Sequence, residues 1–201
     1  MKKWQVLFLV SFLALTPLQA QIYHAGEENS SVKKAGSWLE LSAAGTRMFS
    51  GLEDRGGHDQ LSHQDGLSGR ALVNVLPWLG LGVEGTWFEE AKDIDFVNGY
   101  KALRYGIVGK FTLTPSTQPQ VYLLAGIGKT KRELDYAFAL SETAKTHYLL
   151  AGIGVEVELW SGIFLALEGY GVYDAHKHFS RFFAINHRLE PGTSFRIGKR
   201  F

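Results

Sequence analysis

Residues 146–174 contain two runs in which aliphatic side chains alternate strictly with small or polar ones. The first run ends near Val157, the second begins at Ile163, and Leu159 to Gly162 separate them as a tight turn. A period of two places one kind of side chain on each face of a β-strand. One face is continuously aliphatic, whereas the other mixes Gly, Tyr and Glu. The stretch therefore predicts a hairpin with hydrocarbon on one side and a narrow polar interior on the other, which is typical of a transmembrane β-barrel.

The same alternation recurs along the chain and predicts eight strands. They cover residues 37–49, 68–76, 81–88, 100–113, 121–133, 146–158, 163–174 and 193–201. Short turns near Trp78, Ser116 and Ser161 alternate with longer polar loops near residues 58, 93, 135 and 178. A barrel with both chain ends on one side of a membrane shows this asymmetry. We therefore expect an all-β fold, an eight-stranded antiparallel up-and-down transmembrane β-barrel.

The first twenty residues predict a secretory signal peptide. Lys2 and Lys3 precede an apolar run from Val6 to Leu15, after which Ala20 offers a cleavage site. The run is shorter than the roughly 20 residues that a membrane helix requires. We expect residues 1–20 to be this signal, residues 21–36 a periplasmic lead-in, and residues 37–201 the barrel. No other apolar run is long enough for a membrane helix, so an integral membrane protein with this sequence must span as a closed barrel, and we expect it in the bacterial outer membrane.

Composition excludes several classes of function. The chain has 21 Lys+Arg and 20 Asp+Glu, so it lacks the basic excess of a nucleic-acid-binding protein. It has no Cys, which excludes disulfides, thiolate metal ligands and thiol nucleophiles. A metal site needs three or four converging ligands. The loop histidines show no such spacing, so we expect neither metal nor cofactor; they are His58, His63, His176, His178 and His187.

Ten charged residues have the parity of the interior face. They are Glu40, Arg70, Glu84, Arg104, Lys110, Glu156, Glu158, Glu168, Arg196 and Arg200. Charges in a narrow lumen are costly unless they are paired. Because the acids and bases balance, we expect an ion-pair network that fills the barrel. The alternative is a narrow gated channel in which pairs exchange partners to admit ions; the small strand number excludes large solutes.

Four lysines have lipid-facing parity near the outer ends of neighbouring strands. They are Lys101, Lys129, Lys131 and Lys145. A charge at the membrane midplane costs about 2–4 kcal/mol, and the cost falls towards zero at the interface. These lysines therefore mark the outer rim. They are either a solvated boundary or a patch that binds the phosphates of lipopolysaccharide, because ammonium groups pair well with phosphate.

The C-terminus adds a family resemblance. The chain ends in Phe201, and Phe195 and Ile197 precede it at alternating positions. This ending resembles the signal that the outer-membrane assembly machinery reads in the small outer-membrane barrels, namely the OmpA transmembrane domain and OmpX-like proteins. Lys199 departs from the pattern, because that family has an apolar residue there. The resemblance covers about residues 37–201 and implies outer-membrane lipid and the assembly machinery as partners.

An enzyme that modifies lipid A is a further alternative. His147 lies near the predicted outer rim, with Thr143, Ser141 and Glu133 on the same hairpin, and such chemistry needs a base within reach of a hydroxyl. The His-x-Ser pair that the barrel deacylases carry on the penultimate strand is absent. We therefore expect no enzyme and assign no catalytic residues. A soluble lipid-binding barrel would need an apolar lumen and polar outer faces, the reverse of the observed pattern.

The favoured function is a structural or surface-interaction role through the external loops. Loops are where barrels of fixed architecture place their variable contacts. The loop of residues 175–190 combines His, Phe and Arg, residue types that favour interfaces. We expect it to contact an extracellular ligand or surface.

Overall fold

The computed structural model describes residues 38–49, 52–54, 59–61, 63–91, 97–137, 140–175, 180, 183–185 and 189–201. The predicted signal peptide and lead-in lie outside the described residues, as do His58, His176, His178 and His187. In the described part of the chain, no helix has the length and apolar character that a membrane span requires.

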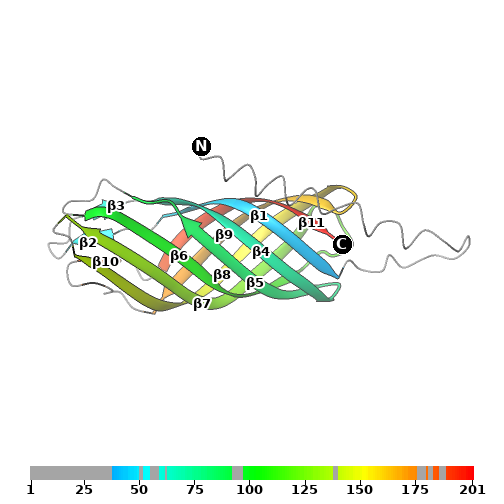
Figure 1. The fold of residues 1–201 in the computed structure, drawn as a ribbon. Coiled ribbons are helices and arrows are strands. Elements are labelled where there is room, and N and C mark those ends of the chain that lie inside the picture. Colours follow the sequence, from blue (N-terminus) through cyan, green and yellow to red (C-terminus); the bar gives the residue numbers. More distant parts are fainter. Residues whose placement is uncertain are drawn as a thin grey trace, which may run out of the picture. The chain divides into compact units, whose positions relative to one another are not determined.

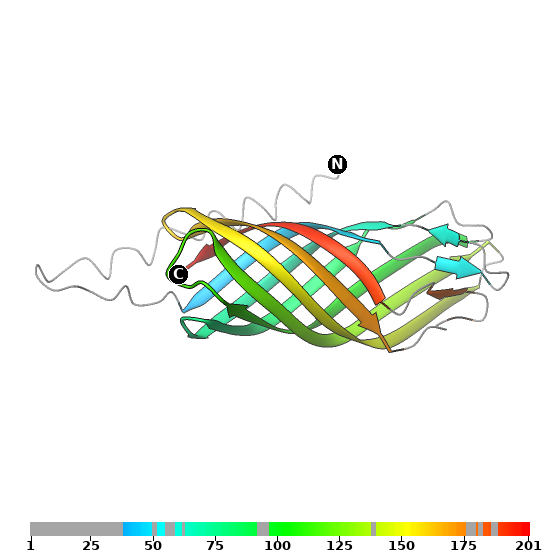
Figure 2. The ribbon, with the colours of Figure 1, turned by 180° about the vertical axis from the view of Figure 1, so that it is seen from behind.

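Eight long strands close into one antiparallel barrel, which confirms the predicted fold class (Figures 1 and 2). Around the barrel the strands follow the order β1-β11-β9-β8-β7-β6-β5-β4. Their bounds are β1 Leu39–Met48, β4 Gln64–Leu76, β5 Leu79–Phe88, β6 Val97–Thr112, β7 Gln120–Tyr136, β8 Ser141–Trp160, β9 Ile163–Asp174 and β11 Leu189–Arg200. The short strands β2 (Leu52–Asp54), β3 (Asp59–Leu61) and β10 (Phe183–Ile185) form a separate sheet in the order β10-β2-β3.

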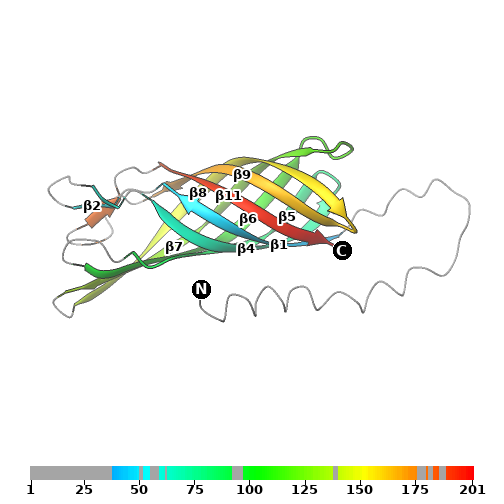
Figure 3. The same ribbon diagram turned by 90° about the horizontal axis from the view of Figure 1, so that it is seen from above.

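The first and last long strands close the barrel. Strand β1 pairs with β11 from Glu40 opposite Arg200 to Met48 opposite Gly192 (Figure 3). The stagger of the barrel is found by following register partners from Leu39 through the other seven strands. The path comes back at Phe49, the residue after β1, which is ten residues further along the chain. This stagger tilts the strands against the barrel axis, and eight strands so arranged leave an interior that side chains fill.

Five of the long strands extend three or more residues further than the hydropathy pattern predicts. Strand β4 begins at Gln64, β6 begins at Val97, β7 runs to Tyr136, β8 begins at Ser141 and β11 begins at Leu189. The loops predicted around residues 135 and 178 are correspondingly shorter, and the loop after β1 contains β2 and β3. The ladder hydrogen bonds continue where the strands leave the apolar layer, but an apolar face is no longer needed there. The end of the apolar alternation is therefore not the end of the strand.

Local chemistry explains two irregular points. Ser161 and Gly162 both have positive φ, 49° and 76°, as a two-residue hairpin turn requires. Pro191 lies inside β11 although it has no N–H to donate. Its carbonyl accepts from Phe49 N, at the last described residue after β1. The missing donor thus faces the end of the β1 ladder, where a proline is tolerated.

The outer surface carries an apolar band between two aromatic girdles. Trp38, Trp78 and Trp160 are exposed at the end that holds the short turns, and Trp87 and Tyr173 are exposed at the other. Between them the outward positions are mainly aliphatic or small, whereas the alternate positions are buried inside. Trp78, in the turn before β5, and Trp87, on β5, are nine residues apart. About nine to eleven residues per strand are needed to cross a membrane.

Candidate functional site in the barrel interior and at its outer rim

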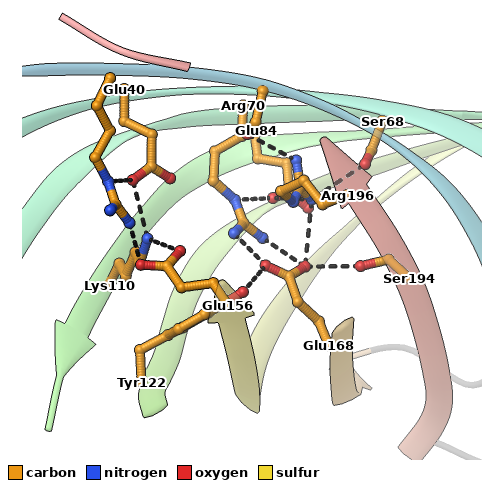
Figure 4. Close-up of polar contacts among 12 residues, drawn as sticks. Glu40, Ser68, Arg70, Glu84, Lys110, Tyr122, Glu156, Glu168, Ser194 and Arg196 are labelled. Atoms are coloured by element: carbon orange, nitrogen blue, oxygen red, sulfur yellow. Dashed lines mark hydrogen bonds and ion pairs between the residues drawn. The ribbon is translucent and has the colours of Figure 1, made fainter. Parts of the chain in front are cut away.

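The interior holds three layers of ion pairs along the barrel axis. The lower layer lies at the barrel end where β1 begins and β11 ends. Lys110 Nζ donates to Glu40 Oε2 at 2.9 Å and to Glu156 Oε2 at 2.6 Å (Figure 4). Arg200 donates to the same two carboxylates and reaches Glu158 Oε2 at 3.5 Å. The Lys110 ammonium also lies 5.4 Å from the centre of the Phe164 ring, a favourable cation–π arrangement. Two cations therefore share three acids in this layer.

The middle layer centres on Glu168. Arg70 donates to both of its oxygens, from Nη1 at 2.5 Å and from Nη2 at 3.1 Å. Tyr122 Oη donates to the same carboxylate at 2.8 Å and Ser194 Oγ at 2.7 Å (Figure 4). Arg196 Nη2 lies 3.3 Å from Glu168 Oε2. Glu168 thus accepts from four side chains on three other strands.

Two further acceptors complete this middle layer. Glu84 accepts from Arg70 and, at 3.3 Å, from Arg196. The serine hydroxyls of Ser42 and Ser68 accept from Arg196 at 3.2 Å each. Two guanidinium groups are balanced by two carboxylates, and all of them except Glu84 are buried. This is the arrangement that a buried charge requires.

The upper layer lies at the barrel end opposite the one where β1 begins and β11 ends. Arg104 Nη2 is 3.1 Å from Glu190 Oε2, and Arg132 Nη1 is 2.8 Å from Asp174 Oδ2. Thr146 Oγ1 accepts from Arg132 at 2.7 Å and donates to Asp174 at 3.0 Å. Among the described residues, Arg104 Nε, Gln64 Nε2 and Thr130 Oγ1 at this level are buried without a hydrogen-bond partner, whereas Arg196 Nε is the one such atom among the side chains of the middle layer. The upper layer is therefore less completely paired than the middle one.

The ten charges assigned to the interior by parity all lie on the inner face. Nine of them form the lower and middle layers, and Arg104 lies in the upper layer. The sequence reasoning missed Arg132, Asp174 and Glu190. Arg132 and Asp174 have the interior parity of their strands, so the same rule could have found them. The sequence predicts Glu190 in a loop, because Pro191-Gly192 was interpreted as a turn before the last strand.

Some of the ion pairs follow the wall, because Arg70–Glu84 and Arg200–Glu40 join residues directly opposite on neighbouring strands. Others bridge the lumen. Arg70 on β4 contacts Glu168 on β9, and Lys110 on β6 contacts Glu40 on β1. In each pair the two strands are three places apart in a circle of eight. These side chains therefore cross the interior, and in the middle layer they meet near its centre (Figure 4).

The four rim lysines lie on the outer face of three adjacent strands. Lys101 is on β6, Lys129 and Lys131 are on β7, and Lys145 is on β8. In the register Lys131 is directly opposite Lys145, Lys129 is opposite His147, and Lys101 is opposite Glu133. We call Lys101, Lys129, Lys131, Lys145 and His147 the lysine patch.

The hydroxyl and imidazole groups considered for catalysis do not come together. His147 and Thr143 are four positions apart on the outer face of β8, with Lys145 between them. Four residues of a strand span about 13 Å, beyond hydrogen-bond reach. Ser141 is two residues further away. Among the described residues there is also no cluster of three His, Asp or Glu side chains that could hold a metal ion.

Comparison with known proteins identifies the kind of barrel. A family model described as "Outer membrane protein beta-barrel domain" matches residues 7–185. Neisserial surface protein A (NspA) superposes with a TM-score of 0.57 at 15% identity, covering 82% of this chain and 96% of that one. Ail of Yersinia pestis, the attachment invasion locus protein, solved in complex with the heparin analogue sucrose octasulfate, superposes with a TM-score of 0.53 at 13% identity, covering 82% and 99%. No curated protein sequence matches the chain. At these identities the structural likeness concerns the fold.

Proposed function

The chain belongs to the outer membrane protein β-barrel domain family, and from this premise we propose that it is a closed, non-conducting barrel that acts at the cell surface. The interaction is made by the barrel end opposite the one where β1 begins and β11 ends, where the strands extend beyond the apolar band. In this proposal the first twenty residues direct export, and the terminal Phe201 is the residue that the assembly machinery reads. The barrel has no catalytic role.

The observation that carries this proposal is the cross-lumen ion pairing. A cation that contacts carboxylates on distant strands closes the space between them, as Arg70–Glu168, Lys110–Glu40 and Arg104–Glu190 do in the three successive layers. Moving an ion through would require separating buried pairs, and breaking one buried pair costs about 3–5 kcal/mol. An interior of this kind supports the barrel and conducts nothing at rest.

The surface role is supported by the unequal heights of the strands. Strands β6, β7 and β8 continue to Val97, Tyr136 and Ser141, well beyond the exposed girdle residue Trp87 on neighbouring β5. Residues 175–188, largely outside the described residues, join β9 to β11 at this same end. We propose that this loop and the projecting strands contact an extracellular ligand or surface.

The closed interior predicts that refolded protein shows no stepwise conductance in planar lipid bilayers. Insertion is verified separately by the slower or faster migration of unboiled protein relative to boiled protein, and a large-pore porin serves as the positive control. Steady conductance from inserted protein would contradict the proposal. It would favour the second candidate, a narrow gated channel, for which Lys110 is the natural gate because it is shared between Glu40 and Glu156.

The orientation predicts a labelling asymmetry that the absence of cysteine makes easy to measure. Thr143→Cys lies on the projecting part of β8, and Ser116→Cys lies in the turn between β6 and β7; both positions are exposed. In intact cells a membrane-impermeant maleimide is expected to label the first and to spare the second until the outer membrane is permeabilised. The reverse pattern would place the lysine patch on the periplasmic side and overturn the proposed surface role.

A further inference from the structure

The lysine patch has more positive charge than its neighbours neutralise. Lys101 Nζ is 3.4 Å from Glu90 Oε1, and Lys131 forms an ion pair with Glu133 that holds the pKa of Glu133 below its ordinary value. Within the described ranges, neither Lys129 nor Lys145 has a carboxylate at ion-pair distance. Four ammonium groups are thus balanced by two carboxylates, with His147 beside them.

The register makes this excess unfavourable for the barrel alone. Lys131 and Lys145 are directly opposite each other, and Lys129 is opposite His147 two positions along. Side chains directly opposite on neighbouring strands have Cβ atoms about 5 Å apart, and like charges at that distance destabilise the sheet. An anion placed between the strands would convert this repulsion into attraction. The patch is therefore arranged for a bound negative group rather than for the stability of the free strands.

The patch begins where the apolar band ends. On β7 the outward residue before Lys129 is the exposed Ile127, and on β8 the outward residue next to His147 is the exposed Leu149. On β6 the outward residue next to Lys101 is the exposed Leu103. These lysines consequently face outward at the level of the lipid head groups, where a charged side chain costs little.

We propose that the lysine patch binds the phosphate groups of an anionic glycolipid of the outer leaflet, that is, the lipid A part of lipopolysaccharide. The identity of the leaflet rests on the surface orientation proposed above. Lys129 and Lys145 provide the uncompensated charge, each with three donors on a flexible stem. Charge-assisted hydrogen bonds to phosphate are about twice as strong as neutral ones. Lys101 and Lys131, each held by a glutamate, form the edges of the site.

The test compares lipid A binding by purified, folded barrels. Wild type, the double variant Lys129→Gln/Lys145→Gln and the control Lys199→Gln are mixed with bisphosphorylated lipid A, and bound lipid is counted by native mass spectrometry. Lys199 is a matched control because it also lies on the outer face. It is near the C-terminal end of β11, at the opposite end of the barrel from the lysine patch. We expect about tenfold weaker binding by the double variant, since two charge-assisted hydrogen bonds are lost, and wild-type binding by the control.

Two further arms identify the chemistry. Monophosphorylated lipid A is expected to bind less well to wild type, and inorganic pyrophosphate is expected to compete only weakly if the acyl chains hold the lipid against the apolar band. Equally strong competition by pyrophosphate would assign the patch to a free phosphate and overturn the lipid proposal. A double variant that binds lipid A like wild type would overturn it as well.

A final variant excludes a trivial loss of structure. Lys129→Arg/Lys145→Arg keeps both charges and is expected to bind lipid A, whereas a requirement for lysine itself would contradict a simple charge mechanism. The binding assay uses isolated protein, so it does not depend on orientation in the cell. The maleimide experiment tests orientation alone, and the failure of either proposal is therefore recognised separately.

Discussion

Replacing Gly82 with alanine is expected to abolish the folded barrel. A Cβ at this inward position on β5 would overlap the carbonyl oxygen of Ala71 and lie 2.8 Å from the Cα of Leu72. Both atoms belong to the backbone of β4, so no side-chain rotation relieves the contact and the β4–β5 ladder must separate. Overpacking with side chains costs about 1–3 kcal/mol, and a backbone clash costs more. The folded, heat-modifiable fraction after refolding should fall by about tenfold or more.

The control is Gly69→Ala on the neighbouring strand. Gly69 faces outward on β4, and a Cβ there would meet nothing within 4 Å. Alanine loses less backbone entropy than glycine on folding, so the folded fraction should equal or slightly exceed that of wild type. Equal yields of the folded band from G82A and G69A would show that the interior is wider than the structure indicates.

Neutralising Glu168 is expected to cause the largest loss of stability among the interior charges. Glu168→Gln leaves the buried guanidiniums of Arg70 and Arg196 with Glu84 as their remaining carboxylate in the middle layer. The new amide also turns a donor towards these guanidiniums. Removing one partner from a buried ion pair costs about 3–5 kcal/mol. Denaturant unfolding of the reconstituted barrel, followed by tryptophan fluorescence, should show a clearly lower midpoint with an unchanged slope.

Two variants separate charge from packing. Glu158→Gln removes a carboxylate that is partly exposed and has a single 3.5 Å contact with Arg200, so its midpoint should stay close to wild type. The double variant Glu168→Gln/Arg70→Gln restores equal numbers of charges and should recover a large part of the lost stability. If it is no more stable than Glu168→Gln, the loss arises from packing of the side chain and the charge argument is wrong.

The fold was predictable because a barrel in a membrane obeys one simple rule. Every strand that crosses lipid must alternate, and its parity can be read without knowing any partner. The same rule assigned Glu168 and Lys110 to the interior. The rule could not predict that Arg70 contacts Glu168 across the lumen in addition to Glu84 on the adjacent strand. That contact depends on the stagger of ten residues, which is defined only when the barrel closes.

The upper layer lies where hydropathy alternation no longer predicts the extent of the strands. Beyond the apolar band, Thr143 and Lys145 alternate with Glu142 and Ala144, so neither face looks apolar although the strand continues. Glu190 follows the same logic at the start of β11, immediately before a proline. In this region strand extent is set by backbone hydrogen bonding to neighbours, which hydropathy does not report. Parity predicts the outward lysines of the lysine patch, but it does not predict that Lys131 lies directly opposite Lys145.

The pairing of acids and bases across the lumen also bears on how the chain reaches its place in the membrane. Arg70 and Glu168 are 98 residues apart, and Arg200 and Glu40 are 160 apart. These pairs cannot form until the last strand meets the first. Before that moment we expect the charged face of the strands to be in water, where it would keep an otherwise aliphatic chain dispersed. The residues that stabilise the finished barrel are therefore also expected to delay hydrophobic association until the barrel closes.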